Sequence, residues 1–268
     1  MVSVGRHSRW LYAVAGSGVV LGLFSYFQSE KKVVHNAWTT NFEPSRKWDF
    51  NWDKRDYSHL INDKSNEDAK KVKPTARRHI FLIRHGQYEE QAESDDKRRL
   101  TATGRKQAEL VGQRLKELKF NYTRMVRSTM LRAQETSNII LENFPDLPKE
   151  DCDLLKEGAP IPPEPPARNW EISDETFLKD GPRIEAAFKK HFHRADVDQK
   201  SDSYEIIVCH GNVIRYFILR LLQFPPEGWL RLQLGHCSIT WVVIGPSGRA
   251  GVNAIGDVGF MPKELMTG

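Results

Sequence analysis

An apolar run that ends in a cation, an imidazole and a glycine is the feature that most constrains this chain. Residues 80–83 are Ile-Phe-Leu-Ile, and Arg84, His85 and Gly86 follow them directly. An uninterrupted apolar run of this length is typical of a strand that is buried on both faces, as in a parallel sheet. Open α/β sheets bind their ligands at the carboxyl ends of such strands. The sequence therefore predicts a ligand site at Arg84 and His85.

A second unit of the same design lies downstream. Residues 204–209 are predicted to form another buried strand, which leads into His210, Gly211 and a helical pattern. A third strand-to-helix junction, at Ser128, precedes a predicted helix that contains Arg132. Because parallel strands end at the same edge of a sheet, two imidazoles and two guanidinium groups are expected around one cleft. Such a set of donors predicts a site for a dianion such as phosphate.

The surrounding pattern predicts an α/β domain at residues 79–268, with a mostly parallel sheet and helices on both faces. Thr101 is a suitable N-cap for a helix that extends to residue 118. The spacing of apolar residues predicts another helix from Pro182 to about Arg194. A short strand is expected at residues 152–155.

The segments before the domain have three different compositions. Residues 1–9 are a short polar segment, and residues 10–27 are an apolar run that is long enough, at about 27 Å, to cross a membrane as a helix. A secretory signal peptide is the main alternative, but no small-residue cleavage site follows the run. We therefore expect a transmembrane anchor at residues 10–27. Residues 28–78 are predicted to be a linker, and residues 62–78 within it are predicted to be a solvated tether.

The linker contains aromatic residues that have no local apolar partners. Trp48, Phe50 and Trp52 alternate with polar residues, so an extended conformation would place all three on one face. Exposed aromatic side chains of this size usually pack against another surface, either on the same domain or on a second copy. We predict that the segment is an oligomerisation motif. Its residues are Trp48, Asp49, Asn51, Trp52 and Asp53.

The distribution of charge argues against a nucleic-acid-binding domain. Residues 1–78 contain 14 Lys and Arg against 8 Asp and Glu, whereas the remaining residues contain 26 against 27. The net charge of +5 therefore comes from the segments before the domain. Three cysteines, at positions 152, 209 and 237, match no zinc-binding spacing. We expect no metal and no cofactor.

Five blocks of the predicted domain resemble one enzyme family in their order and spacing. The blocks are residues 84–86, 100–108, 128–136, 157–160 and 210–212. Over residues 79–262 the chain resembles the histidine phosphatase superfamily, in its phosphoglycerate mutase branch. The apolar run at the amino terminus, the motif at residues 48–53 and the segment at residues 224–231 are similar to the mitochondrial serine/threonine protein phosphatases of that family.

The resemblance implies a role for each of five side chains. His85 is the expected nucleophile, which forms a phosphohistidine, and Arg84 and Arg132 are expected to bind the phosphoryl oxygens. His210 is expected to be a third donor to the phosphate and a catalytic residue, favoured in the imidazolium form beside the dianion. Glu157 is expected to be the general acid and base, and the sequence leaves its protonation state open. A proline-rich stiff loop follows it and could form a wall of the cleft.

The resemblance also implies partners and a location. The expected substrates are phosphorylated proteins, including a signalling kinase, and the expected location is the mitochondrial outer membrane, with a single-pass anchor and a homo-oligomeric assembly. A phosphoglycerate mutase or small-molecule phosphatase is one alternative. Residues 87–89, Gln-Tyr-Glu, lack the run that mutases have after the first glycine. A non-catalytic oligomeric scaffold is the other alternative. His191, His193 and His236 are interpreted as structural or surface residues.

Overall fold

The structure is a computed structural model that describes residues 44, 46–56, 73–168 and 171–268. The chain divides into two units, Met1–Lys47 and Trp48–Gly268, and nearly all of the described residues belong to the second. The expected membrane anchor and most of the expected linker lie outside the described residues. In the part of the chain that is described, no helix has the length and apolar character needed to cross a bilayer.

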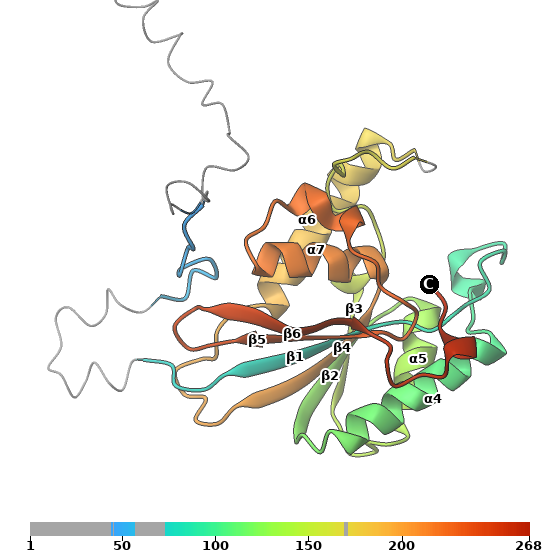
Figure 1. Cartoon of the computed structure of the whole chain (residues 1–268), viewed down its shortest axis with the longest axis horizontal. Coiled ribbons are helices and arrows are strands. Elements are labelled where there is room, and N and C mark those ends of the chain that lie inside the picture. Colours follow the sequence, from blue (N-terminus) through green and yellow to red (C-terminus); the bar gives the residue numbers. More distant parts are fainter. Residues whose placement is uncertain (1–43, 45, 57–72, 169–170) are drawn as a thin grey trace, which may run out of the picture. The chain divides into compact units, whose positions relative to one another are not determined.

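A six-stranded mixed sheet forms the centre of the second unit (Figure 1). The strands are β1 Arg78–Arg84, β2 Tyr122–Ser128, β3 Lys149–Cys152, β4 Ser203–Cys209, β5 Ile239–Ile244 and β6 Ala250–Asp257. Their spatial order is β3-β2-β4-β1-β5-β6. The pairs β1–β4, β2–β4 and β2–β3 are parallel, whereas β5 runs antiparallel to both β1 and β6. The expected α/β fold with a mostly parallel sheet is confirmed.

Helices cover both faces of this sheet (Figure 1). One face packs against α4 (Ala102–Glu117) and α5 (Leu131–Leu141), and the other packs against α6 (Asp174–His191) and α7 (Gly211–Leu221). Side chains of β1 alternate between the two cores, because successive residues of a strand point to opposite faces. Short 3-10 helices lie in the connections: η2 Asp95–Lys97, η3 Asp153–Leu155, η4 Pro226–Arg231 and η5 Lys263–Leu265.

Two predicted elements differ from the observed ones. The helix expected to begin at Pro182 begins at Asp174, because the Ser173 side chain accepts a hydrogen bond from the Thr176 N–H and caps the helix. Pro182 therefore lies inside α6 rather than at its start. The strand expected at residues 152–155 is also shifted. β3 ends at Cys152, and the following residues form a 3-10 turn. The α4 helix begins as expected, with the Thr101 side chain as its cap.

The aromatic segment forms a turn rather than the extended conformation that its alternating sequence suggests. The Asp49 side chain accepts a hydrogen bond from the Asn51 N–H (2.8 Å), and the Lys54 N–H donates to the Asn51 carbonyl (3.0 Å). Asp and Asn side chains favour such turns because they can bond to the backbone two residues further on. As a result the aromatic residues do not share one environment, and Phe50 remains 51% exposed.

This segment packs against its own domain. The Trp52 indole N–H donates to the Gly248 carbonyl (2.7 Å), and its ring lies 5.8 Å from the ring of Phe188. Asp53 forms an ion pair with Arg194 (2.8 Å), in which both side chains are buried. The described contacts therefore lie within one chain. The predicted role of the segment in oligomer assembly stays a prediction.

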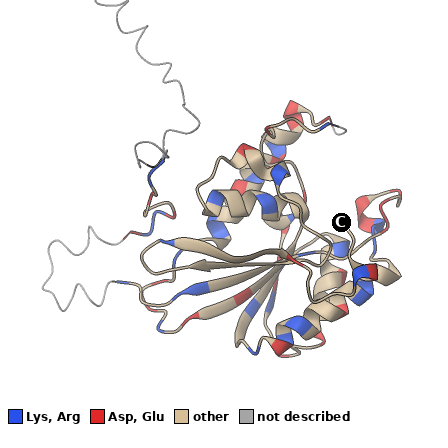
Figure 2. Ribbon diagram, in the orientation of Figure 1, with Lys and Arg blue, Asp and Glu red and all other residues tan. Residues whose placement is uncertain are grey.

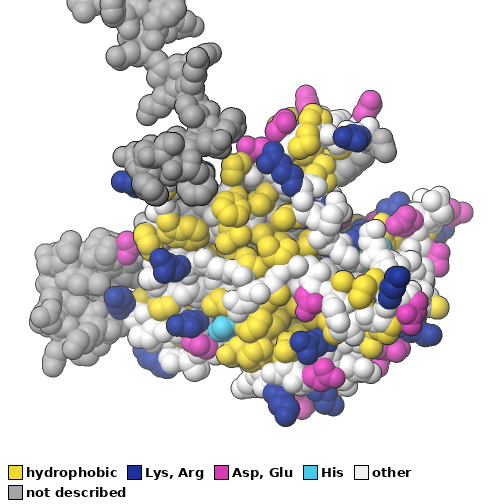
Figure 3. Space-filling model, viewed as in Figure 1, with side chains coloured by type: hydrophobic (Ala, Val, Ile, Leu, Met, Phe, Trp, Pro, Cys, Tyr) yellow, Lys and Arg dark blue, Asp and Glu magenta, His cyan; other side chains and the backbone are white. Residues whose placement is uncertain are grey.

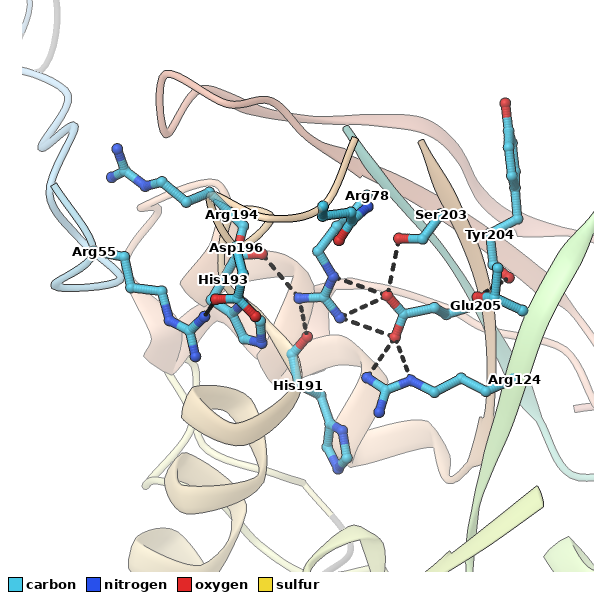
Figure 4. Close-up of polar contacts among 12 residues, drawn as sticks. Arg55, Arg78, Arg124, His191, His193, Arg194, Asp196, Ser203, Tyr204 and Glu205 are labelled. Carbon is cyan, nitrogen blue, oxygen red and sulfur yellow. Dashed lines mark hydrogen bonds and ion pairs between the residues drawn. The ribbon is translucent and has the colours of Figure 1, made fainter. Parts of the chain in front are cut away.

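A buried ion network lies at the amino ends of the central strands (Figure 4). Arg78 of β1 pairs with Glu205 of β4 (2.7 Å), and Arg124 of β2 pairs with the same carboxylate (2.6 Å). The Arg78 guanidinium also donates to the backbone carbonyls of His191 (3.1 Å) and His193 (2.9 Å). Because every charge in this cluster has a partner, burying it does not leave an unpaired ion.

Charged side chains of both signs are interspersed over the helices and strands (Figure 2). This agrees with the near balance of charge in the domain. On the face shown in Figure 3, apolar side chains gather around the β5–β6 hairpin. The exposed large apolar residues of the described chain are Phe50, Leu178, Phe224, Ile255 and Met266.

Candidate active site

The carboxyl ends of three strands bring the predicted site residues together. The register of β1 and β4 pairs Arg84 with Cys209, so the next residue of each chain segment, His85 and His210, are neighbours. Their ring centroids are 5.1 Å apart. β2 ends at Ser128, and α5 follows and carries Arg132, whose Nε lies 3.3 Å from His85 Nε2.

The local contacts of His85 define which of its nitrogens can attack. Nδ1 lies 2.9 Å from the Gly86 carbonyl oxygen, which can only accept a hydrogen bond, so Nδ1 carries the proton. The lone pair is therefore on Nε2. Burial lowers the pKa of His85 well below its ordinary value, and the nearby His210, Arg132 and Arg84 lower it further. The imidazole is consequently neutral at pH 7, as a nucleophile requires.

Glycine is required immediately after His85. A Cβ at Gly86 would lie 2.6 Å from the Gly104 carbonyl oxygen, at the start of α4. The Gly86 N–H also donates to the Thr136 hydroxyl of α5 (3.0 Å). This close approach ties the turn after β1 to both helices on that face, which fixes the position of the His85 ring.

Two buried nitrogen atoms of the site have no hydrogen-bond partner among the described residues. Arg84 has its Nη atoms engaged by the Leu234 carbonyl and by His236 Nε2 (3.2 Å), but its Nε has no hydrogen-bond partner. His210 Nε2 contacts the Ser128 hydroxyl (2.8 Å), and its Nδ1 has no partner. Buried polar groups are normally satisfied, and both of these atoms can donate to an anionic oxygen.

His210 was expected to be an imidazolium beside a bound dianion, and that stays a prediction; the surroundings of the ring by themselves favour the neutral form. Burial, together with Arg132, Arg183 and Arg84, lowers the pKa of His210 well below its ordinary value. The ligand-free ring is therefore neutral. It can still donate to an anion from Nδ1 if the Ser128 hydroxyl donates to Nε2. The Ser128 hydroxyl already accepts a hydrogen bond from the Met130 N–H (3.3 Å), so its own proton is available to His210 Nε2.

Glu157 lies beside these donors, at the amino end of α7. Its carboxylate accepts hydrogen bonds from the Gly158 N–H (3.2 Å) and, at 3.5 Å, from the Asn212 N–H. Burial raises the pKa of Glu157 more than these bonds and the nearby Arg132 and Arg84 lower it. The balance that the sequence left open therefore favours the protonated carboxyl, which suits a general acid.

His236 is buried against the predicted site residue Arg84, so it is not a surface residue and the structural interpretation applies. Its Nε2 accepts from Arg84, and its Nδ1 lies 2.9 Å from the Thr267 hydroxyl. Burial and Arg84 lower its pKa to about 3, so it is neutral. His236 precedes β5, and the antiparallel pairing of β5 with β1 places it here. No local pattern in the sequence indicates that pairing.

The comparisons with known proteins agree with this geometry. The sequence profile described as "Histidine phosphatase superfamily (branch 1)" matches residues 80–160 and 162–254. The chain belongs to the histidine phosphatase superfamily. The side chains at positions 84, 85, 132, 157 and 210, which the fold brings together, all lie within the matched residues.

Proteins similar along nearly the whole chain are found in flies. One is the "Serine/threonine-protein phosphatase Pgam5, mitochondrial" of Drosophila yakuba, which is 47% identical over 94% of this chain and 92% of its own length. The protein of the same description from Drosophila melanogaster is 47% identical over 95% of this chain and 94% of its own length.

Solved structures of other proteins share the fold. A phosphoglycerate mutase from Plasmodium falciparum is 32% identical, with a TM-score of 0.50, and the match covers 70% of this chain and 96% of that protein. A putative alpha-ribazole-5'-P phosphatase from Escherichia coli is 19% identical, with a TM-score of 0.51, over 69% of this chain and 97% of that protein. The second likeness concerns the fold alone.

Proposed function

We propose that this protein is a serine/threonine protein phosphatase that acts through a phosphohistidine on His85. The observation on which the proposal rests is the state of the His85 ring. Its Nδ1 is tied to the Gly86 carbonyl, its Nε2 has the lone pair, and two buried donors without partners lie beside it. Substrate class comes from the fly relatives, which are described as serine/threonine-protein phosphatases.

In the first step, His85 Nε2 attacks the phosphorus atom of the phosphoserine or phosphothreonine. The bond from phosphorus to the leaving oxygen breaks, and Glu157 gives its proton to that oxygen. In the second step, a water molecule attacks the phosphohistidine, Glu157 takes a proton from the water, and inorganic phosphate and neutral His85 are regenerated. Both steps use the same two side chains, so the site returns to its starting state.

The negative charge of the phosphoryl group is balanced by the protein's own cations and donors. Arg84 Nε and His210 Nδ1 are free to donate to two phosphoryl oxygens, and Arg132 supplies a further guanidinium next to His85. In phosphoryl transfer, catalysis depends mainly on positioning and on stabilising charge on the equatorial oxygens. The chain's own residues supply both requirements.

The location and assembly extend the proposal. The fly relatives are described as mitochondrial, and the apolar run at residues 10–27 supports a single-pass anchor in the outer membrane. We propose that the protein acts there as a homo-oligomer, with residues 48–53 at the contact between copies, on phosphorylated proteins that include a signalling kinase.

A small-molecule phosphatase or mutase is the second candidate. It is favoured by the likeness to the Plasmodium protein, which is described as a phosphoglycerate mutase. The deciding experiment measures turnover of the full chain on phosphoserine, phosphothreonine and phosphotyrosine peptides and on 3-phosphoglycerate. We expect hydrolysis of the first two peptides. Turnover of 3-phosphoglycerate alone would identify a mutase or small-molecule enzyme. If none of these substrates is turned over, the non-catalytic oligomeric scaffold is the remaining function.

A further inference from the structure

The guanidinium group of Arg132 donates hydrogen bonds to the side chains of His85 and Asp95. Its Nε donates to His85 Nε2, and its Nη1 donates to a carboxylate oxygen of Asp95 (2.8 Å). The Arg132 side chain is 4% exposed, whereas that of Asp95 is 41% exposed. A surface carboxylate therefore reaches inward to a buried cation, and the Tyr88 ring covers that cation from one side at 4.8 Å.

These two contacts block two things that the proposed reaction needs. The Asp95 oxygen occupies a donor of Arg132 that a phosphoryl oxygen would use. The Arg132 Nε–H lies on the lone pair of His85 that must attack the phosphorus atom. A phosphoryl group can bind productively only when Arg132 exchanges both contacts for phosphoryl oxygens.

The position of Asp95 makes this exchange feasible. Asp95 is the first residue of η2, in an acidic loop that leaves the site and returns to it (Figures 1 and 2). The base of the loop is fixed by the pairing of Tyr88 with Leu100. Arg98 of the same loop lies 3.2 Å from the Asp95 carboxylate. When Asp95 releases Arg132, its charge therefore keeps a partner.

We propose that Asp95 is an internal competitor, a carboxylate that competes with incoming anions for Arg132 and so sets a threshold of affinity that a ligand must exceed. A protein surface presents many Asp and Glu carboxylates, which are monoanions and would otherwise bind to the same guanidinium. A tethered carboxylate has a high effective concentration and excludes them. A phosphomonoester is mostly a dianion at pH 7, so its stronger attraction to the site displaces Asp95. The inference rests on the proposed function, because it takes Arg132 as a phosphate ligand.

The test compares Asp95→Asn and Asp95→Ala with Glu93→Gln. Glu93 lies in the same loop, is exposed and pairs with Lys97, so its replacement removes the same charge without touching Arg132. Binding of inorganic phosphate and of acetate to the full chain is measured by calorimetry, and KM is measured with a phosphoserine peptide. We expect both Asp95 variants to bind phosphate on the order of fivefold more tightly, as the loss of one competing exposed ion pair implies.

Acetate should bind too weakly to the parent protein to be measured but should become a measurable ligand of the Asp95 variants, and KM should fall by a similar factor. Glu93→Gln should match the parent in all three measurements. Phosphate binding that is unchanged in the Asp95 variants would overturn the proposal. Weaker binding together with a lower kcat would also overturn it, because Asp95 would then position Arg132 rather than compete for it.

Calorimetry does not depend on turnover, so the two hypotheses fail separately. If phosphopeptides are not hydrolysed by any variant but the Asp95 variants still bind phosphate more tightly, the enzyme proposal fails and the competitor proposal stands. If His85 is required for turnover but the Asp95 variants bind phosphate like the parent, the competitor proposal fails and the enzyme proposal stands. Melting temperatures establish that the compared proteins are equally folded.

Discussion

At the scale of single residues, the chemistry depends on which nitrogen of His85 has the lone pair. The bond from Nδ1 to the Gly86 carbonyl leaves the lone pair on Nε2, so His85→Ala removes the only atom that can form the proposed intermediate. We expect turnover of a phosphoserine peptide to fall roughly a thousandfold or more. His193→Ala, which alters a histidine outside the site, serves as the control. A His85→Ala protein with near-parental turnover would exclude His85 as the nucleophile.

Glu157 gives the site a pH dependence whose direction can be worked out. Its pKa is raised, mainly by burial, and its proton is needed by the leaving oxygen, so turnover should fall as pH rises through that pKa. The pKa of His85 is lowered, mainly by burial, and neutral His85 is needed, so the acidic loss of activity should lie below pH 6.5. Rates measured from pH 4 to 9 on phosphoserine peptide test both limbs.

A Glu157→Gln variant tests the proposed role of Glu157 as the general acid. We expect kcat on phosphoserine peptide to fall by about 10² to 10⁴ and the alkaline limb to disappear. The loss should be much smaller with p-nitrophenyl phosphate, because its leaving group needs no proton. An equal loss on both substrates would show that Glu157 is not the general acid.

At the scale of elements, the buried network between β1, β2 and β4 should matter for stability. Burial by itself raises the pKa of Glu205, but Arg78 and Arg124 lower it below its ordinary value. Removing the charge with Glu205→Gln leaves Arg78 buried without its partner, which we expect to lower the free energy of unfolding by about 3–5 kcal/mol. Urea unfolding measures this change. Glu150→Gln, which removes an exposed partner of Lys190, should cost at most about 1 kcal/mol.

The same pair makes stability depend on pH. Because the pKa of Glu205 is lower in the folded state, its contribution is complete above the ordinary value of 4.5 and is lost as pH falls through the folded pKa. The Glu205→Gln variant should therefore lose less stability than the parent protein on acidification below pH 4.5. Identical acid dependence in the two proteins would contradict this account of the pair.

How far the sequence could predict these elements depends on the range of the contacts. Arg84, His85 and His210 follow directly from strands with a clear apolar pattern, so their convergence was predictable. His236 and Asp95 reach the site from connecting segments, by contacts with residues 152 and 37 positions away, and nothing local encodes such contacts. The early start of α6 was missed because a proline normally marks a first helical turn, whereas here the cap at Ser173 decides the boundary.

At the scale of the whole molecule, the segment at residues 48–53 connects folding with the proposed assembly. Trp52 and Asp53 bind to their own domain, and Phe50 is exposed next to them. We expect Trp48→Ala combined with Trp52→Ala to give a smaller assembly and lower turnover, as measured by light scattering and by peptide hydrolysis. Unchanged mass and unchanged turnover would exclude a role in assembly. Phe50→Ala, which alters only the exposed ring, separates contact between copies from packing within one chain.

The pairing of β1 with β4 has a consequence for the accuracy of folding. One register seats Glu205 against Arg78 and, about 20 Å further along the same two strands, sets Arg84 beside Cys209. A misaligned pair would leave the buried Arg78 guanidinium without its carboxylate, which is costly. The ion pair near one end of the two strands therefore favours the same register that places His85 next to His210 at the other end.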